Sequence, residues 1–468
     1  MIRIFGCIRH AKSWISVTHV CARWRDIAYN NPDLWKDVSE EYCAPWLIDM
    51  ITARARGERL LSVTIPIWPR VTDDPQSVKS KYLSGLLEQQ LHRMQCLSLT
   101  ASGHPSELCR SLFSAPSISL LELKVTTLFV FPWALAGTNF ENLTALNIGH
   151  NGSKEATSSL VDIVTALQRM RNLTQLKLLD IDLDPLDILR DDHFATLPSL
   201  QCFTLSSTIW VAYELLCHLR IPSGTLADIN VLHRGEDSQT IRTLFSQVHT
   251  SVLPSILHAS PALRKLDESR EMLVFTDTVV IHTSLGNDIP GKLSFRLERD
   301  RDLTDLSWRL PVYEAAMSLF ASEGLQKLVT DAFSRRDWED ALGRLPDTRT
   351  IVVIGESSDE LCMALLESMM VVTPSAQTES TRNAQGIPFP RLASLTLWSV
   401  NLETDIWTTE ELPKSMGDIL VEIIRMRKNA PVHLDDLILQ ECMIPDGFRE
   451  RVQEADENIV RNIQNEIR

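Results

Sequence analysis

The hydrophobic residues of this 468-residue chain repeat one short phrase: an apolar residue, two others, an apolar residue, one other, and a final apolar residue. Two copies have almost the same wording, Asn142–Ile148 (NLTALNI) and Asn172–Leu178 (NLTQLKL). Copies begin at positions 94, 118, 143, 173, 200 and 226, which places them 24 to 30 residues apart. Later copies begin at Leu392 and Leu434, and Leu60–Ile65 reads as an earlier one. The alternating end of each phrase predicts a half-buried strand.

Between these phrases, apolar residues at helical spacing predict helices. The expected apolar faces are Leu83, Leu86, Leu87 and Leu91, then Leu160, Ile163, Val164 and Leu167, and later Met416, Ile419, Leu420, Ile423 and Ile424. One strand and one helix in every 24–30 residues is the unit of a leucine-rich repeat, which buries its apolar face only by stacking on its neighbours. We therefore expect an α/β fold: an irregular leucine-rich-repeat solenoid over residues 58–445. The alternative for each phrase is an ordinary strand.

Residues 232–350 are less regular, and the pattern leaves open whether they are distorted repeats or a separate small α/β piece. The pattern predicts a strand over Glu271–His282 and a partner strand over Lys292–Glu298. It predicts helices over Val312–Phe320 and Asp337–Leu345.

Two further segments lie near the end of the chain. The polar segment 371–390 ends in proline and predicts a loop. Residues 446–468 place apolar side chains on one helical face amid alternating charges, namely Val452, Ile459, Ile463 and Ile467. We expect an amphipathic C-terminal helix that caps the repeats, and a partner helix or a dimer seam is the alternative.

The first forty residues have a different residue pattern, without the repeated phrase. Trp14, Trp24 and Trp35 are spaced by ten and eleven residues. Helical spacing joins Val17, Val20, Cys21 and Trp24, with Arg23 and Arg25 facing away, and Asn30–Asp33 should end this helix. A segment of about forty residues rarely forms a core of its own. It therefore docks on the repeats or presents its apolar face to a partner.

The phrase Val17–Ala28 (VTHVCARWRDIA), followed by Pro32–Trp35 (PDLW), resembles the second half of an F-box. The longer wording from Trp14 to Arg25 is similar to F-box-like proteins of mushroom-forming (basidiomycete) fungi. In that group a helix such as Ala44–Ile51 and a strand such as Leu60–Ile65 follow. This resemblance implies a truncated F-box-like segment (1–40) and a connecting helix (41–57), and the hydrophobic pattern adds the repeats (58–445) and the C-terminal helix (446–468).

F-box proteins are substrate receptors of cullin-RING (SCF-type) ubiquitin ligases. The resemblance therefore implies that the N-terminal helices bind a Skp-family adaptor and that the repeats capture an unidentified target protein. It implies a non-enzymatic, cytoplasmic or nuclear protein that is monomeric apart from this complex. The implied adaptor-binding residues are Ile4, Phe5, Val17, Val20, Cys21, Trp24, Leu34 and Trp35.

Two alternatives stay open for this segment. Trp24 and Trp35 could simply pack on each other and on the first repeat. The family's F-box also opens with a Leu-Pro pair, whereas only Met1–Ile8 stands here for the first helix. A leucine-rich-repeat scaffold that has lost adaptor binding is therefore the alternative function.

Charge and composition narrow the remaining classes. The chain has 46 basic and 61 acidic residues, a net charge of −15, and no run of clustered Lys or Arg, which argues against a nucleic-acid or anionic-lipid binder. The longest apolar stretch, Val125–Gly137, contains Pro132 and is too short to span a bilayer. The nine cysteines include no Cys-x-x-Cys, so neither a zinc ribbon nor a redox pair is indicated.

The chain offers little catalytic chemistry. Gly286–Lys292 has the spacing of a phosphate-binding loop, but Leu293 stands where Ser or Thr would hold magnesium, and an alternating strand pattern follows. We read this segment as a hairpin turn. The adjacent Cys217 and His218 diverge on a helix and read as packing residues. We expect no cofactor, no metal site and no enzymatic activity.

Overall fold

The chain has a mixed α/β fold with parallel strands. In the computed structural model, the described residues are 21–30, 35, 37–39, 49, 53, 61–67, 89–101, 113, 119–127, 131–150, 157–184, 193–222, 225–233, 243, 269–274, 278–284, 290–299, 325–331, 333–355, 357–372, 389–407, 413–429, 433–457, 459 and 465–466. Eight α-helices lie within these ranges. The chain divides into two compact units, Met1–Ile229 with Pro254–His258, and Asn230–Leu253 with Ala259–Arg468.

The strands of the first unit follow one another in chain order. They are β1 (Asp37–Ser39), β2 (Leu61–Ile67), β3 (Met94–Ala101), β4 (Glu122–Thr127), β5 (Ala145–His150), β6 (Gln175–Ile181), β8 (Cys202–Thr208) and the start of β10 (Leu226–His233). Each neighbouring pair from β1 to β8 is parallel. Every phrase picked out in the sequence between Leu60 and Val231 therefore supplies a strand, as predicted.

The register places the same position of each phrase side by side. One row of partners is Leu97, Leu123, Leu146, Leu176 and Phe203, and the next is Leu99, Val125, Ile148, Leu178 and Leu205. All of these side chains are at most 2% exposed. The repeated apolar positions thus form one continuous core along the first unit, because each strand buries the same face as its neighbour.

A ladder of threonine hydroxyls joins the starts of these strands. The hydroxyl of Thr144 donates to the carbonyl of Leu121 at 3.1 Å, and that of Thr174 donates to the carbonyl of Thr144 at 2.9 Å. Thr225 repeats the arrangement on the carbonyl of Leu200 at 2.9 Å. The shared Asn-Leu-Thr wording of two phrases therefore has a structural reason, since its threonine bonds the preceding turn.

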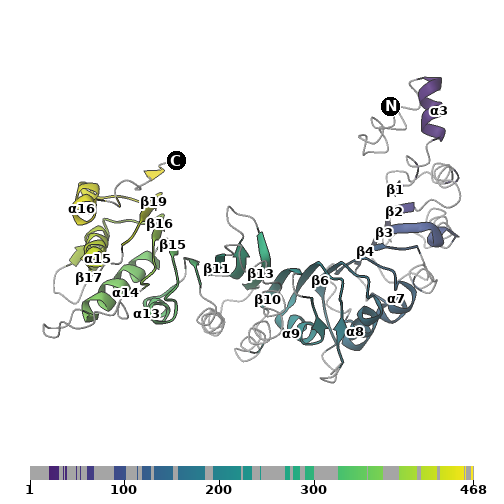
Figure 1. Ribbon diagram of the computed structural model, residues 1–468, viewed down its shortest axis with the longest axis horizontal. Helices are drawn as coiled ribbons and strands as arrows, with labels where there is room; N and C mark the ends of the chain where they lie inside the picture. The colour runs from purple at the N-terminus through teal and green to yellow at the C-terminus, as the bar shows by residue number, and fades with distance from the viewer. Residues whose placement is uncertain are drawn as a thin grey trace, which may run out of the picture. The chain divides into compact units, whose positions relative to one another are not determined.

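Helices α7 (Trp133–Asn139), α8 (Leu160–Arg169) and α9 (Ile209–Cys217) lie along one side of these strands (Figure 1). The expected apolar face of α8 is confirmed, because Leu160, Ile163, Val164 and Leu167 are all buried. Its first turn is capped by Ser159, whose hydroxyl accepts the N–H of Asp162. The expected face at 83–87 lies outside the described residues, and Leu91 begins the short 3-10 turn η3 (Leu91–Arg93).

The second unit combines an antiparallel meander with a parallel sheet, in the order β13-β12-β11-β14-β15-β16-β19-β20. The strands are β11 (Ser269–Val274), β12 (Thr278–Ser284), β13 (Pro290–Arg299), β14 (Lys327–Thr330), β15 (Thr350–Ile354), β16 (Ser394–Trp398), β19 (Asp436–Gln440) and β20 (Asn465–Glu466). Strand β11 pairs in parallel with β14, and each later neighbouring pair up to β20 is also parallel. Strands β11, β12 and β13 pair antiparallel.

One strand prediction in this unit was wrong. The stretch Glu271–His282 is not a single strand, because it folds back so that Glu271 pairs with His282. The polar residues Thr276 and Asp277 interrupt its apolar run, which explains the reversal. Its partner was predicted correctly, since β13 pairs with β12 and Lys292 lies inside a strand.

Helices α13 (Arg335–Arg344), α14 (Ser357–Val372), α15 (Met416–Asn429) and α16 (Phe448–Ala455) succeed one another along this sheet (Figure 1). Strands β17 (Asp405–Trp407) and β18 (Pro413–Ser415) form a small hairpin before α15. The expected helices at 337–345 and 416–424 are confirmed. The predicted helix 312–320 and most of the predicted loop 371–390 lie outside the described residues.

The C-terminal helix is shorter than the sequence pattern predicts. It ends at Ala455, because Asp456 adopts an extended conformation. Val452 and Ile459 are buried as expected, but Asn465–Glu466 forms β20 beside β19. The edge of a sheet offers unpaired backbone groups, and β20 satisfies them where the helical pattern alone predicted a longer helix.

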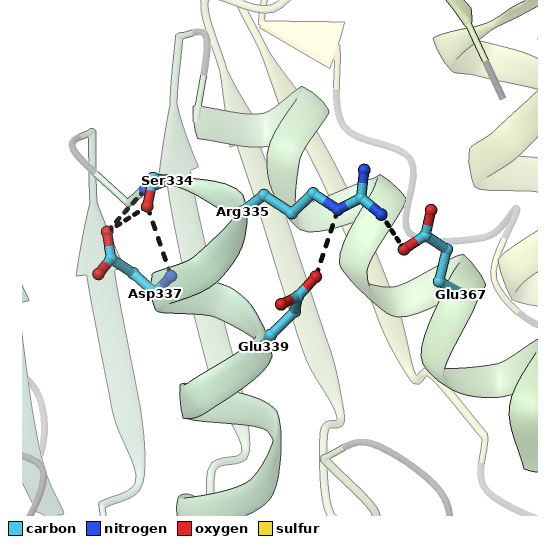
Figure 2. A network of polar contacts seen from close by, with 5 residues as sticks. All are labelled: Ser334, Arg335, Asp337, Glu339 and Glu367. Atoms are coloured by element: carbon cyan, nitrogen blue, oxygen red, sulfur yellow. Dashed lines mark hydrogen bonds and ion pairs between the residues drawn. The ribbon is translucent and has the colours of Figure 1, made fainter. Parts of the chain in front are cut away.

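Polar contacts fix where α13 begins and tie it to α14, as Figure 2 shows. Ser334 accepts the N–H of Asp337, and the Asp337 carboxylate accepts the N–H of Ser334 at 2.9 Å, which forms a capping box. Arg335 donates to Glu339 on its own helix at 3.3 Å and forms an ion pair with Glu367 of α14. These pairs are partly exposed, so each adds little stability.

Arg427 is a buried cation in α15 at 1% exposure. Its Nη2 donates to the carbonyls of Phe389 and Leu392, both at 3.2 Å. Desolvation by burial lowers the pKa of the guanidinium to about 10. The side chain therefore stays charged near neutral pH and holds α15 against the segment that leads into β16.

Candidate functional site

The N-terminal segment is built around helix α3 (Ala22–Asn30). Its first turn closes where the N–H of Arg25 donates to the carbonyl of Cys21 at 3.0 Å. Trp24 and Ile27, three residues apart on the helix, are both half-buried, whereas Arg23 and Arg25 are exposed. The helix ends at Asn30, before the Asn-Pro sequence that was predicted to stop it.

Trp35 packs against helix α3 and lies two residues before the first strand. Its side chain is 1% exposed, and its ring lies 5.9 Å from that of Tyr29, tilted by 47°. Two residues later, β1 pairs in parallel with β2, where Val38 is the partner of Val63. Trp35 is therefore a core residue of the chain, and any effect on partner binding must come through the position in which it holds α3.

The eight predicted adaptor-binding residues differ in where they lie. Ile4, Phe5, Val17, Val20 and Leu34 lie outside the described residues. Of the other three, Cys21 is exposed, Trp24 is half-buried and Trp35 is buried. Cys21 and Trp24 are adjacent on one helical face, so these two side chains are the ones that could contact a partner directly.

Two residues of α3 were absent from the sequence-based set. Ile27 continues the face of Cys21 and Trp24 at helical spacing, and it is half-buried. The ring of Tyr29 lies tilted against that of Trp35. The spacing of Ile27 could have identified it, whereas the Tyr29–Trp35 contact joins the helix to a residue beyond the helix stop, which no periodicity encodes.

Outside this segment, the structure describes the adjacent pair Cys217 and His218, which the sequence analysis interpreted as packing residues. His218 is 5% exposed, and its Nδ1 lies 2.8 Å from the carbonyl of His193. Burial raises the pKa of the nearby Glu214 carboxyl, and the charge of His218 opposes this. These contacts give His218 a packing role at the end of α9.

A surface pocket of about 440 Å³ lies in the first unit, lined by Gln168, Arg171, Phe194, Thr196 and Pro198. The amide of Gln168 donates to the carbonyl of Phe194 and is therefore occupied. The side chain of Arg171 is exposed. The lining thus brings together one exposed cation, one hydroxyl and an aromatic ring.

The described residues contain no candidate metal site, no candidate membrane-spanning helix and no disulfide. Over those residues, no cluster of three or more His, Cys, Asp or Glu side chains has a metal-binding arrangement. No helix in that part of the chain combines the length and apolar character that crossing a bilayer requires. The six cysteines that lie there are free thiols.

Comparison with known proteins identifies the N-terminal segment. The family model described as F-box-like matches residues 1–41. The match includes α3, Trp35 and β1, the elements described above. No curated protein matches the chain. The chain therefore carries an F-box-like domain at residues 1–41, a class of domain that generally binds Skp-family adaptors.

Proposed function

We propose that this chain is a non-enzymatic substrate receptor of an SCF-type ubiquitin ligase. The F-box-like match over residues 1–41 is the observation that carries the proposal. In this proposal the domain binds a Skp-family adaptor through Cys21, Trp24 and the face of α3 that continues at Ile27. The receptor performs no chemistry itself, because holding a target beside the ligase raises the local concentration of the target.

The strands and helices behind this domain would form an irregular leucine-rich-repeat array that captures the target protein. Three features support this part of the proposal: parallel strands in chain order, aligned apolar rows, and the threonine ladder. In the second unit, the thiol of Cys442 donates to the carbonyl of Leu397 on the preceding strand at 3.3 Å, which joins two successive strands. Such repetition is typical of stacked repeats.

Binding of purified Skp-family adaptor to the full chain, measured by biolayer interferometry, tests the proposal. We expect Trp24→Ala to weaken binding by about 30-fold or more, the loss typical of an aromatic anchor in an interface. Trp398→Ala is the matched control, because Trp398 is an accessible tryptophan of the second unit. Circular dichroism establishes that both variants are folded before binding is compared.

The outcomes separate the two candidate functions. A folded Trp24→Ala variant that binds adaptor as tightly as the unaltered chain would remove Trp24 from the interface. Absence of adaptor binding by the unaltered chain would favour the second candidate, a repeat scaffold without adaptor binding. The burial of Trp35 favours that candidate specifically, because it gives the segment a structural role within the chain.

A further inference from the structure

The parallel strands of the second unit bury one side more completely than the other, which we call the open side. On the helix-covered side, Leu328, Ile351, Leu395 and Leu437 are register partners and are at most 2% exposed. Successive side chains of a strand point to opposite faces. The residues between these core positions therefore face the opposite side of the sheet.

That open side carries four apolar residues near the carboxyl ends of the strands, together with the polar Thr396 and Gln440, and Thr396 is 8% exposed. Val352 and Ile438 lie in one register row, separated by Thr396, and Ile354 and Trp398 are partners in the next row. We call Val352, Ile354, Trp398 and Ile438 the Trp398 patch. Trp398 is 40% exposed, and the other three side chains are half-buried. Neighbouring strands lie about 4.8 Å apart, so Ile354 and Trp398 adjoin directly, whereas Val352 and Ile438 lie on either side of Thr396.

The open side of the first unit has a different character. The corresponding row of partners there is polar: Thr64, Ser98, Lys124, Asn147, Lys177 and Thr204. The two lysines in this row are exposed. The apolar patch is therefore not a general property of these strands, because the strands of both units bury their leucines in the same way but differ on the open side.

The backbone around Trp398 is held on both sides. The N–H of Gly355 donates to the carbonyl of Trp398 at 2.9 Å, and the N–H of Ser399 donates to the carbonyl of Gln440 at 2.9 Å. The hydroxyl of Ser399 also donates to the carboxylate of Glu441 at 3.2 Å. The patch is therefore preformed, which lowers the entropic cost of binding.

The segments that follow these three strands are acidic. Residues 355–361, 399–412 and 441–448 contain no Lys, Arg or His. They carry nine carboxylates: Glu356, Asp359, Glu360, Glu403, Asp405, Glu410, Glu411, Glu441 and Asp446. The carboxylate of Glu441 is exposed, and its hydrogen bond to Ser399 links it to the residue that follows Trp398. An exposed tryptophan near the carboxylate of Glu441 is complementary to a cation, which an indole face and a carboxylate both attract.

We propose that the Trp398 patch docks the target protein through an extended basic segment, in which Arg or Lys stacks on Trp398 and an apolar side chain covers Val352 and Ile438. This inference rests on the proposed receptor function, because it names the chemistry of the target. A second copy of this chain fits the patch poorly, since two chains of net charge −15 repel each other.

Fluorescence anisotropy of labelled peptides against the full chain tests this assignment. The probe is Arg-Arg-Leu-Ser-Leu-Arg-Arg; one control peptide replaces its arginines by glutamates and another replaces its leucines by serines. We expect binding of the probe and at least about fivefold weaker binding of both controls. Trp398→Ala should weaken probe binding by about fivefold or more, and Glu441→Gln should weaken it and reduce its dependence on salt.

The matched control is Leu226→Ala, which removes an apolar side chain that is 51% exposed in the first unit and should leave probe binding unchanged. Failure of the probe to bind, equal binding of the glutamate peptide, or unchanged binding to folded Trp398→Ala would each overturn the assignment. A native mass that falls from dimer to monomer in Trp398→Ala, seen by sedimentation, would also overturn it by making the patch a self-association surface.

The failure of this inference and that of the proposed function are distinguishable. Adaptor binding should depend on Trp24 and be unaffected by Trp398→Ala, whereas probe binding should show the reverse. Probe binding by a chain that does not bind adaptor would refute the receptor function and retain the peptide-docking surface.

Discussion

Removal of the Trp35 ring should detach the F-box-like segment from the sheet. Trp35 is 1% exposed, and truncation of such a side chain to alanine costs about 3–5 kcal/mol. Loss of the ring contact with Tyr29 adds about 0.5–1.5 kcal/mol. Among the described residues, the strand pairing between this segment and the sheet is the three-residue register of β1 on β2.

A segment of about forty residues has little stability of its own. The loss should therefore appear as local unfolding of α3 and β1, while the later strands of the first unit stay folded. Hydrogen exchange measured by mass spectrometry on the full chain checks this. We expect the amides of α3 and β1 in Trp35→Ala to lose protection, and those of β5 and β6 to keep it.

Adaptor binding should disappear with that protection, although the Trp35 side chain is too buried to contact a partner. Trp35→Phe keeps an aromatic ring against Tyr29 and should retain most of both properties. The reasoning is refuted if Trp35→Ala keeps native protection across α3. It is equally refuted if adaptor binding is lost while α3 stays fully protected, because that result makes Trp35 a direct contact.

Three further predictions concern the second unit. Gly355 has a φ of +64°, and a Cβ added there would meet no atom within 4 Å, so Gly355→Ala should cost about 1 kcal/mol from backbone strain alone, seen as a lower urea midpoint. Arg427→Ala leaves two buried carbonyls without their hydrogen-bond donor and should lower the free energy of unfolding by about 3 kcal/mol or more. Arg425 on the same helix is exposed, so Arg425→Ala should lower it by less than about 0.5 kcal/mol in the same urea titration. Burial raises the pKa of the Cys362 thiol to about 12, so maleimide should label the exposed Cys21 and spare Cys362 until the chain unfolds. The thiol of the unfolded chain ionises from about pH 9, so the free energy of unfolding should fall as the pH rises from about 9 toward 12.

The strands were predictable because each phrase carries its own alternation. Leu395 and Leu397 identify a buried face without reference to any other strand, and the same holds for Leu437 and Leu439. The reversal inside 271–282 and the short strand β20 were missed, because they depend on pairing with distant backbone. Periodicity describes one element at a time and contains no information on which edge that element will meet.

The same distinction between local patterns and contacts with distant residues applies to the candidate site. The sequence predicted the helix of Trp24 and its stop at Asn30, both of which are local properties. It left open whether Trp35 was covered by the chain or by a partner, because the sequence shows that a residue is apolar but does not show what buries it. The Trp398 patch was equally invisible, since its members come from three phrases and adjoin only through the register.

The backbone at Glu441 supports a functional reading of the patch. Glu441 and Ser399 both have a φ of +55°, in the left-handed region, whereas the corresponding position after β15 is Gly355. A side chain there costs roughly 1–2 kcal/mol that glycine avoids, partly offset by the entropy that glycine loses on folding. Glutamate at this position is thus held at the expense of stability, beside an exposed tryptophan. If the carboxylate serves the docking of a basic segment, Glu441→Gly should raise the urea midpoint and weaken probe binding together. A purely structural role for Glu441 predicts instead that both quantities fall or that binding stays unchanged.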